Sequence, residues 1–344
     1  MVLAAEATFE EKLHALPDLV VLQTEEQILD IPNVSFLGKV AGFFEPKFDP
    51  QFDRELKDPR SYISTEGLNM PMTYRIFNQE YFNNGNPMVV YNFSLFVPGH
   101  RGAELPSLFE ITRLAREHGS AVIAITTDGY DQELTKEQLY SLKNFEGMAQ
   151  RRLDLLEDIT TQGQELIVTG ASLGGMMSYE IAALNSRKSN SKVSITKIIS
   201  LCSSGHNSYA PYDLVKVFRQ FSTGELMPAF KYLRCDDNPV NIFKRTLEFA
   251  QTVPTNTQQV IASSLIAYAI LNSPLKKVEQ MISPETEVLD EVYSSDSVSQ
   301  PYLRPLNWDK AKDHPKSKHQ ISIVKGNHLS LLTHGLETTL LNLF

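Results

Sequence analysis

The segment Glu165-Leu-Ile-Val-Thr-Gly-Ala-Ser-Leu-Gly-Gly-Met-Met-Ser-Tyr-Glu-Ile-Ala-Ala-Leu184 carries the strongest structural signal in the sequence. Its apolar run at 166–169 predicts a short strand, and the stretch after the glycines predicts a helix. Between them, Gly170-Ala-Ser172-Leu-Gly174 places a serine between two glycines. Such a turn holds the serine on a tight, strained bend, with its oxygen projecting above a sheet, and a Cβ on either glycine would collide with neighbouring backbone. We therefore interpret Ser172 as a candidate nucleophile.

Strands and helices are expected to alternate around this segment. Apolar and β-branched runs predict strands at 34–44, 72–77, 87–98, 121–125 and 193–202, and helical spacing predicts helices at 104–118 and 135–161. The charged run at 49–60 is predicted to be a surface loop. Alternation of this kind requires crossover connections, so we expect a mostly parallel central sheet with helices on both faces, in the α/β class.

The alternation stops after the strand at 193–202. Residues 209–282 contain several helical segments separated by prolines, and their richest apolar stretch is 260–271. Strand patterns resume at 287–293 and 320–324, and a helix at 329–341 closes the chain. The expected organisation is an N-terminal arm at 1–32, a core made of 33–206 and 286–344, and an all-helical cap inserted at 207–285.

The composition excludes several classes of protein. The 344 residues are 42% hydrophobic and 21% charged, which is typical of a globular chain. A formal net charge of −9 gives no basic surface for nucleic acid. Cys202 and Cys235 are too few for a disulfide framework and fit a reducing compartment. The early acidic residues and the lack of a long apolar run predict no secretory signal and no spanning helix, hence a cytoplasmic protein, with the oligomeric state left open.

A serine nucleophile needs a base, and the base needs an orienting carboxylate. His328 follows the last predicted strand and Gly326-Asn327, where a base would reach the same edge of the sheet as Ser172. Asp296 lies in a turn after the preceding strand and is our candidate acid. The alternatives for the acid are Asp290, Glu291, Asp309 and Asp313.

An oxyanion hole requires two backbone N–H donors aimed at the developing negative charge. The amide of Leu173 directly follows the nucleophile and supplies one. The other is expected in the turn after the strand at 87–98, with His100 as its donor. Gly99 lets that turn approach closely, Arg101 could hold an acidic substrate group or remain a solvated loop residue, and His206 is a further substrate-binding candidate.

The order Ser172, Asp296, His328, with Pro98-Gly-His-Arg-Gly102 upstream and a helical insertion, resembles the α/β-hydrolase family. The resemblance covers the chain from about residue 70 to its end, outside the cap. It implies ester or thioester hydrolysis through an acyl-serine intermediate, with no cofactor and no metal, on a small substrate with a substantial apolar part. An acyltransferase using the same acyl-serine and a catalytically silent binding protein are the alternatives. The turn begins Pro98-Gly99 where many relatives have His-Gly, which leaves the subfamily open.

Overall fold

The computed structural model describes part of the chain. The described residues are 20–23, 48–64, 70–94, 104–201, 258, 259, 261, 262, 265, 266, 269, 281–293, 318–324 and 343–344. Within them, no helix is both long enough and apolar enough to cross a lipid bilayer.

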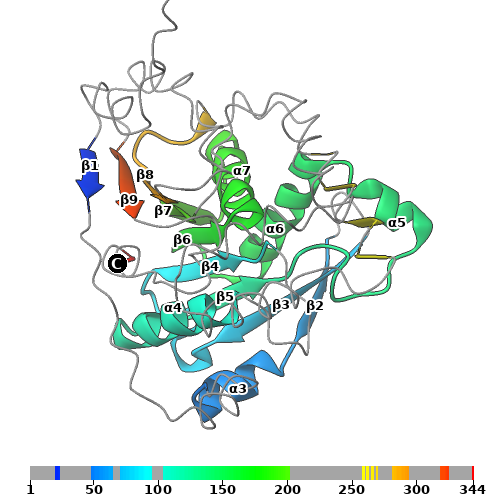
Figure 1. Ribbon diagram of the computed structural model, residues 1–344, viewed down its shortest axis with the longest axis horizontal. Helices are drawn as coiled ribbons and strands as arrows, with labels where there is room; N and C mark the ends of the chain where they lie inside the picture. Colours follow the sequence, from blue (N-terminus) through cyan, green and yellow to red (C-terminus); the bar gives the residue numbers. More distant parts are fainter. Residues whose placement is uncertain are drawn as a thin grey trace, which may run out of the picture.

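A single sheet of nine described strands runs through the molecule in the order β1-β9-β8-β7-β6-β4-β5-β3-β2 (Figure 1). The strands are β1 Val20–Gln23, β2 Arg60–Ile63, β3 Pro71–Phe77, β4 Met88–Asn92, β5 Val122–Ile125, β6 Gln164–Ala171, β7 Val193–Leu201, β8 Glu287–Tyr293 and β9 Lys318–Val324. Strand β3 is antiparallel to both of its neighbours, β2 and β5, and all other neighbouring pairs are parallel. The expected mostly parallel sheet is confirmed.

Helices cover both faces of this sheet, which explains why its central strands are rich in apolar residues. The described helices are α3 Pro50–Leu56, the 3₁₀ turn η1 Gln79–Tyr81, α4 Leu105–Glu117, α5 Lys136–Ser141, α6 Phe145–Ile159 and α7 Leu173–Arg187. Helices α6 and α7 pack on one face, and α3 and α4 pack on the other (Figure 1). All residues of β4 and of β5 are consequently buried.

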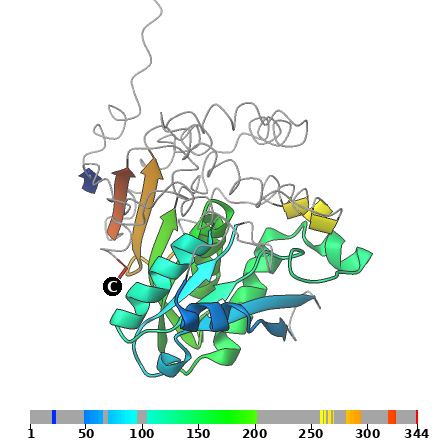
Figure 2. The ribbon, with the colours of Figure 1, turned by 60° about the horizontal axis from the view of Figure 1, so that its bottom comes forward.

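The parallel strands end at one edge of the sheet, where Figure 2 shows their arrowheads pointing the same way. Ser172 follows β6 at this edge, between β4 on one side and β7 on the other. Because β8 and β9 are parallel to β7, their last residues, Tyr293 and Val324, also lie at this edge. Ligands of open α/β sheets bind at this end of the strands.

The predicted loop at 49–60 is wrong. Its residues form helix α3 and the start of β2. Asp49 caps α3 by accepting a hydrogen bond of 2.8 Å from the amide of Phe52, whose ring is buried against the sheet. The charged residues of this run suggested a loop, but they lie on a helix that buries only one of its sides.

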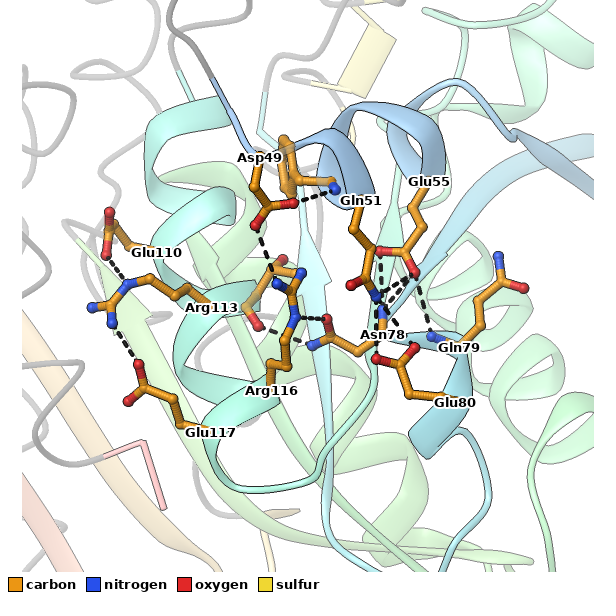
Figure 3. Close-up of polar contacts among 12 residues, drawn as sticks. Asp49, Gln51, Glu55, Asn78, Gln79, Glu80, Glu110, Arg113, Arg116 and Glu117 are labelled. Carbon is orange, nitrogen blue, oxygen red and sulfur yellow. Dashed lines mark hydrogen bonds and ion pairs between the residues drawn. The ribbon is translucent and has the colours of Figure 1, made fainter.

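A network of polar side chains anchors α3 to the turn after β3 and to α4 (Figure 3). The Glu55 carboxylate accepts from the amide of Asn78 at 3.1 Å. Arg116 of α4 donates to the Asn78 side chain at 3.0 Å and to Asp49 at 3.2 Å. Asn78 has a left-handed backbone with φ 56°, and these contacts stabilise that conformation.

The prediction of a single helix at 135–161 is also wrong, because the structure has two helices there, α5 and α6. Thr135 caps α5 with a capping box that includes Gln138, and the side chain of Asn144 caps α6 by accepting from the amide of Gly147 at 2.9 Å. Both residues favour helix starts over helix interiors. Asn144 therefore interrupts a run whose apolar spacing continues through it.

The remaining strand predictions have different outcomes. The strand at 287–293 is confirmed with the predicted bounds, and those at 72–77, 121–125, 193–202 and 320–324 are confirmed to within two residues. The strand predicted at 87–98 ends earlier, at Asn92. Residues 20–23 of the N-terminal arm form β1, which pairs in parallel with β9. The predicted strand at 34–44 and the helix at 329–341 lie outside the described residues.

Two parts of the predicted cap are described: residues 281–285, and helical residues between 258 and 269, which are drawn in yellow beside the loop before α5 (Figure 2). Gln258 accepts a hydrogen bond from the amide of Leu134 at 3.0 Å and donates to the carbonyl oxygens of Gly129 and Gln132 at 3.0 and 2.5 Å. Ala262 is buried in the same core cluster as α6. This segment is thus docked on the loop that follows β5.

Candidate active site

Ser172 connects β6 directly to α7 with a strained backbone. Its φ is +48° and its ψ is −111°. Positive φ occurs at only three non-glycine residues of the described part of the chain, and the other two are asparagines, which tolerate it far better than serine does. The amide of Ser172 donates to the carbonyl oxygen of Leu201 at the end of β7, at 2.8 Å. Strain of this kind costs about 1–3 kcal/mol and is concentrated at functional sites.

The two glycines around the serine are required by close backbone contacts. A Cβ on Gly174 would lie 1.9 Å from the carbonyl oxygen of Asn92, at the end of β4. A Cβ on Gly170 would lie 2.5 Å from the carbonyl carbon of Gly174 and 2.6 Å from the same Asn92 oxygen. Neither backbone atom can move aside cheaply. The glycines thus let α7 start directly against the end of β4, which supports the reading of the sequence as a nucleophile turn.

Leu173 begins α7, so helix geometry leaves its amide without an intrahelical acceptor. Ser172 and Leu173 are both half-buried, in contrast to the buried residues that follow them in the helix. The positive end of the helix dipole lies at the same point. An anionic oxygen near Ser172 would therefore meet favourable electrostatics, as an oxyanion hole requires.

Two buried residues, Ser94 and Glu104, join the described parts of the chain on either side of residues 95–103. The Glu104 carboxylate accepts from the amide of Ser94 at 3.1 Å, from the Ser94 hydroxyl at 2.5 Å and from the hydroxyl of Tyr91 at 3.2 Å. Burial, together with the charge of Glu104, raises the pKa of Tyr91 and keeps its hydroxyl protonated as a donor. Gly99, His100 and Arg101 belong to residues 95–103 and lie outside the described residues.

Two of the candidate acids, Asp290 and Glu291, lie within the described residues. Asp290 lies inside β8, and both of its carboxylate oxygens accept from the buried Tyr179 hydroxyl of α7, at 2.7 and 2.8 Å. Glu291, the next residue, is also buried and lies on the opposite face of the strand. Asp290 therefore faces α7 from within the sheet and does not extend from its edge.

The other members of the predicted triad lie outside the described residues. These are Asp296, His328 and the alternative acids Asp309 and Asp313, together with the substrate-binding candidate His206. Their positions in the sequence are still informative. Strand β8 ends three residues before Asp296, and β9 ends four residues before His328.

Asp128 lies in the loop after β5. Its carboxylate is buried and accepts hydrogen bonds of 2.7 Å from Arg151 and from Arg152 of α6. Burial alone would raise the pKa of Asp128, but the two arginines outweigh it and the pKa is lowered. Asp128 thus joins the loop after β5 to α6 in ionised form. Within the described residues, no three His, Cys, Asp or Glu side chains gather as a metal site would require.

Asn92 and Glu104 are two site-supporting residues that the sequence patterns did not indicate. Asn92 ends an apolar strand, and Glu104 opens an amphipathic helix, positions at which polar residues usually meet solvent. Their burial at 1% and 3% exposure depends on contacts with residues distant in the sequence. No local signal could have identified them.

The topology and the turn at Ser172 define the α/β-hydrolase fold. No family model matches the sequence, and no curated protein matches it by sequence. Among solved structures, one of a carboxylesterase of Nitrososphaera gargenis is 19% identical, with a TM-score of 0.55, over 81% of this chain and 95% of that one.

Two further solved structures are similar. A thermophilic esterase of Thermogutta terrifontis is 13% identical with a TM-score of 0.53, over 83% of this chain and 96% of that one. A thioesterase domain from the curacin biosynthetic pathway is 11% identical with a TM-score of 0.52, over 83% and 98%. At these identities the likeness establishes the fold.

Proposed function

We propose that the protein is a serine hydrolase of carboxylic esters or thioesters. Ser172 attacks the acyl carbon, His328 accepts the serine proton and returns it to the leaving group, and Asp296 orients His328. The amides of Leu173 and His100 stabilise the oxyanion, and water releases the acyl group from the serine. The cap at 207–285 supplies the apolar wall of the substrate site.

The strained backbone of Ser172, with φ +48°, is the observation that carries this proposal. Strain of this kind costs free energy and is concentrated at functional sites, which favours an active serine over a catalytically silent binding protein. The parallel strands β8 and β9 direct the chain toward the edge of Ser172 shortly before Asp296 and His328. The esterase and thioesterase names of the structural neighbours favour the same reaction class, although a fold alone does not fix a substrate.

Steady-state hydrolysis by Ser172→Ala and by wild type tests the proposal. The substrates are p-nitrophenyl esters and acyl thioesters of increasing acyl length. We expect Ser172→Ala to lower kcat by about a thousandfold or more, because serine and base act as a unit. Ser186→Ala, an exposed serine at the other end of α7, is the matched control and should retain wild-type turnover. Turnover by Ser172→Ala near the wild-type rate would overturn the proposal.

The same assay separates hydrolysis from acyl transfer. An alcohol or amine acceptor added to the reaction would yield a new ester or amide if the enzyme were a transferase. No described contact favours an acceptor other than water, so we expect the free acid as the product.

A further inference from the structure

A row of buried polar residues crosses the sheet just below the turn at Ser172. The strand registers pair Asn92 with Gly170, Gly170 with Ser200, and Ser200 with Asp290. Residues in register on parallel neighbours project to the same face of a sheet. That face carries α7, because Asn92 and Asp290 both bond to side chains of this helix. Asn92 and Ser200 are each 1% exposed, and Asp290 is 7% exposed.

Asn92 contacts the first turn of α7 through both its backbone and its side chain. Its carbonyl oxygen packs against Gly174 so closely that no Cβ fits between them. Its side-chain amide donates to the Ser178 hydroxyl at 3.0 Å, and that hydroxyl donates to the carbonyl oxygen of Gly174 at 2.9 Å. One residue of β4 thus fixes the distance between its strand and the peptide groups next to Ser172.

Tyr179, the next residue of α7, is bonded to a strand on the opposite side of β6 from β4. Tyr179 donates to both carboxylate oxygens of Asp290 in β8. In the sheet, β6 lies next to β4 and is separated from β8 by β7. Ser178 and Tyr179 therefore tie α7 to strands on both sides of the strand that carries the nucleophile. Hydrogen bonds between buried side chains on both sides of β6 restrict the position of the helix.

We propose that Asn92 is a positioning residue that holds the Leu173 half of the oxyanion hole in place against the end of β4, acting through Ser178. This inference rests on the proposed function. The amide of Leu173 lies in the first turn of α7, which Asn92 contacts through its carbonyl oxygen and, by way of Ser178, through its side chain. Catalysis by preorganised N–H donors depends on their geometry, so a loosened first turn slows the chemical step more than it weakens substrate binding.

The test compares Asn92→Leu, Ser178→Ala and the double variant with wild type, with each kcat expressed per site titrated by a fluorophosphonate. Leucine has the branched shape of asparagine, is larger, and removes its hydrogen bonds, so the smaller change in Ser178→Ala tests the same contact without added volume. A misplacement of about 1 Å can cost about a hundredfold in rate. We expect kcat to fall at least about tenfold in each single variant with KM within about twofold, and the double variant to be no worse than the single variants.

Thr112→Val is the matched control, because Thr112 is equally buried and its hydroxyl has no partner among the described residues, yet it lies on α4. Its kcat should equal that of wild type. An Asn92→Leu kcat within about twofold of wild type, or additive losses in the double variant, would overturn the positioning role.

Amide hydrogen exchange gives a readout that does not depend on any substrate. In Asn92→Leu, peptides covering 173–177 should exchange at least about tenfold faster than in wild type, whereas Thr112→Val leaves them unchanged. If Ser172→Ala keeps turnover, the proposed function fails and exchange alone decides the positioning role. Unchanged exchange at 173–177 in Asn92→Leu then overturns it.

Discussion

Glu180 lies near the middle of α7 and is only 4% exposed. Burial is the main cause that raises its pKa from 4.5 to about 7, and the negative charge of Glu146 adds to it, while Arg187 acts in the opposite direction. The folded protein therefore binds the Glu180 proton more tightly than the unfolded chain does. Stability from this group is fully present below about pH 4.5, is lost as the pH rises to about 7, and is constant above that.

The size of this loss follows from the shift. A pKa change of one unit corresponds to about 1.4 kcal/mol, so the rise from 4.5 to about 7 corresponds to about 3 kcal/mol of unfolding free energy. Glu180→Gln keeps the shape of the protonated side chain and cannot ionise. Relative to wild type, we expect it to be nearly neutral at about pH 4.5 and more stable by about 3 kcal/mol at about pH 8.

Equilibrium urea unfolding of both proteins at several pH values measures this difference. Glu165→Gln on β6, which removes an exposed carboxylate, is the control substitution and is measured at the same pH values. A constant stability difference between Glu180→Gln and wild type from about pH 4.5 to about pH 8 would refute the assignment of a proton to Glu180.

Three further substitutions probe the elements that hold the site. Gly174→Ala places a Cβ 1.9 Å from a backbone oxygen. We expect this variant to lose ester turnover and to unfold with a free energy lower by about 3 kcal/mol or more. A fully active and stable variant would contradict the close contact. Asp128→Asn leaves two buried arginines without their anion and should lower the free energy of unfolding by about 3–5 kcal/mol. An unchanged midpoint of urea unfolding would contradict this expectation. Gln258→Leu removes three hydrogen bonds to the loop at 129–134, and faster amide exchange in that loop, with unchanged exchange in α4, is the expected result.

The apolar pattern of the sequence was sufficient for most of the sheet. Strands such as β4 and β5 are buried on both faces, so each reads as a short and mostly apolar run. The turn at Ser172 was predictable from local sequence, because a side chain at either of its glycines would collide with neighbouring backbone. The antiparallel pairing of β3 was not predictable, since strand direction is set by contacts between distant segments.

Polar residues were the main source of error. The charged run at 49–60 reads as solvated, yet Glu55 is buried and bonds to a turn more than twenty residues away. The apolar spacing of α5 and α6 continues across Asn144. The side chain of Asn144 caps the start of α6, and this cap marks the break between the two helices. Asn92, Glu104 and Glu180 are likewise buried by neighbours that a local reading cannot see. A buried polar residue has the same sequence signature as an exposed one.

The activation of Ser172 is tested most directly by locating a covalent adduct. Wild-type protein would be treated with an alkyl fluorophosphonate, digested, and mapped by mass spectrometry. We expect one equivalent of label, carried by the peptide that contains Ser172, and a labelling rate that falls at least about a hundredfold in His328→Ala. Label on another residue, or labelling of Ser172→Ala at the wild-type rate, would contradict the central claim that Ser172 is an activated nucleophile.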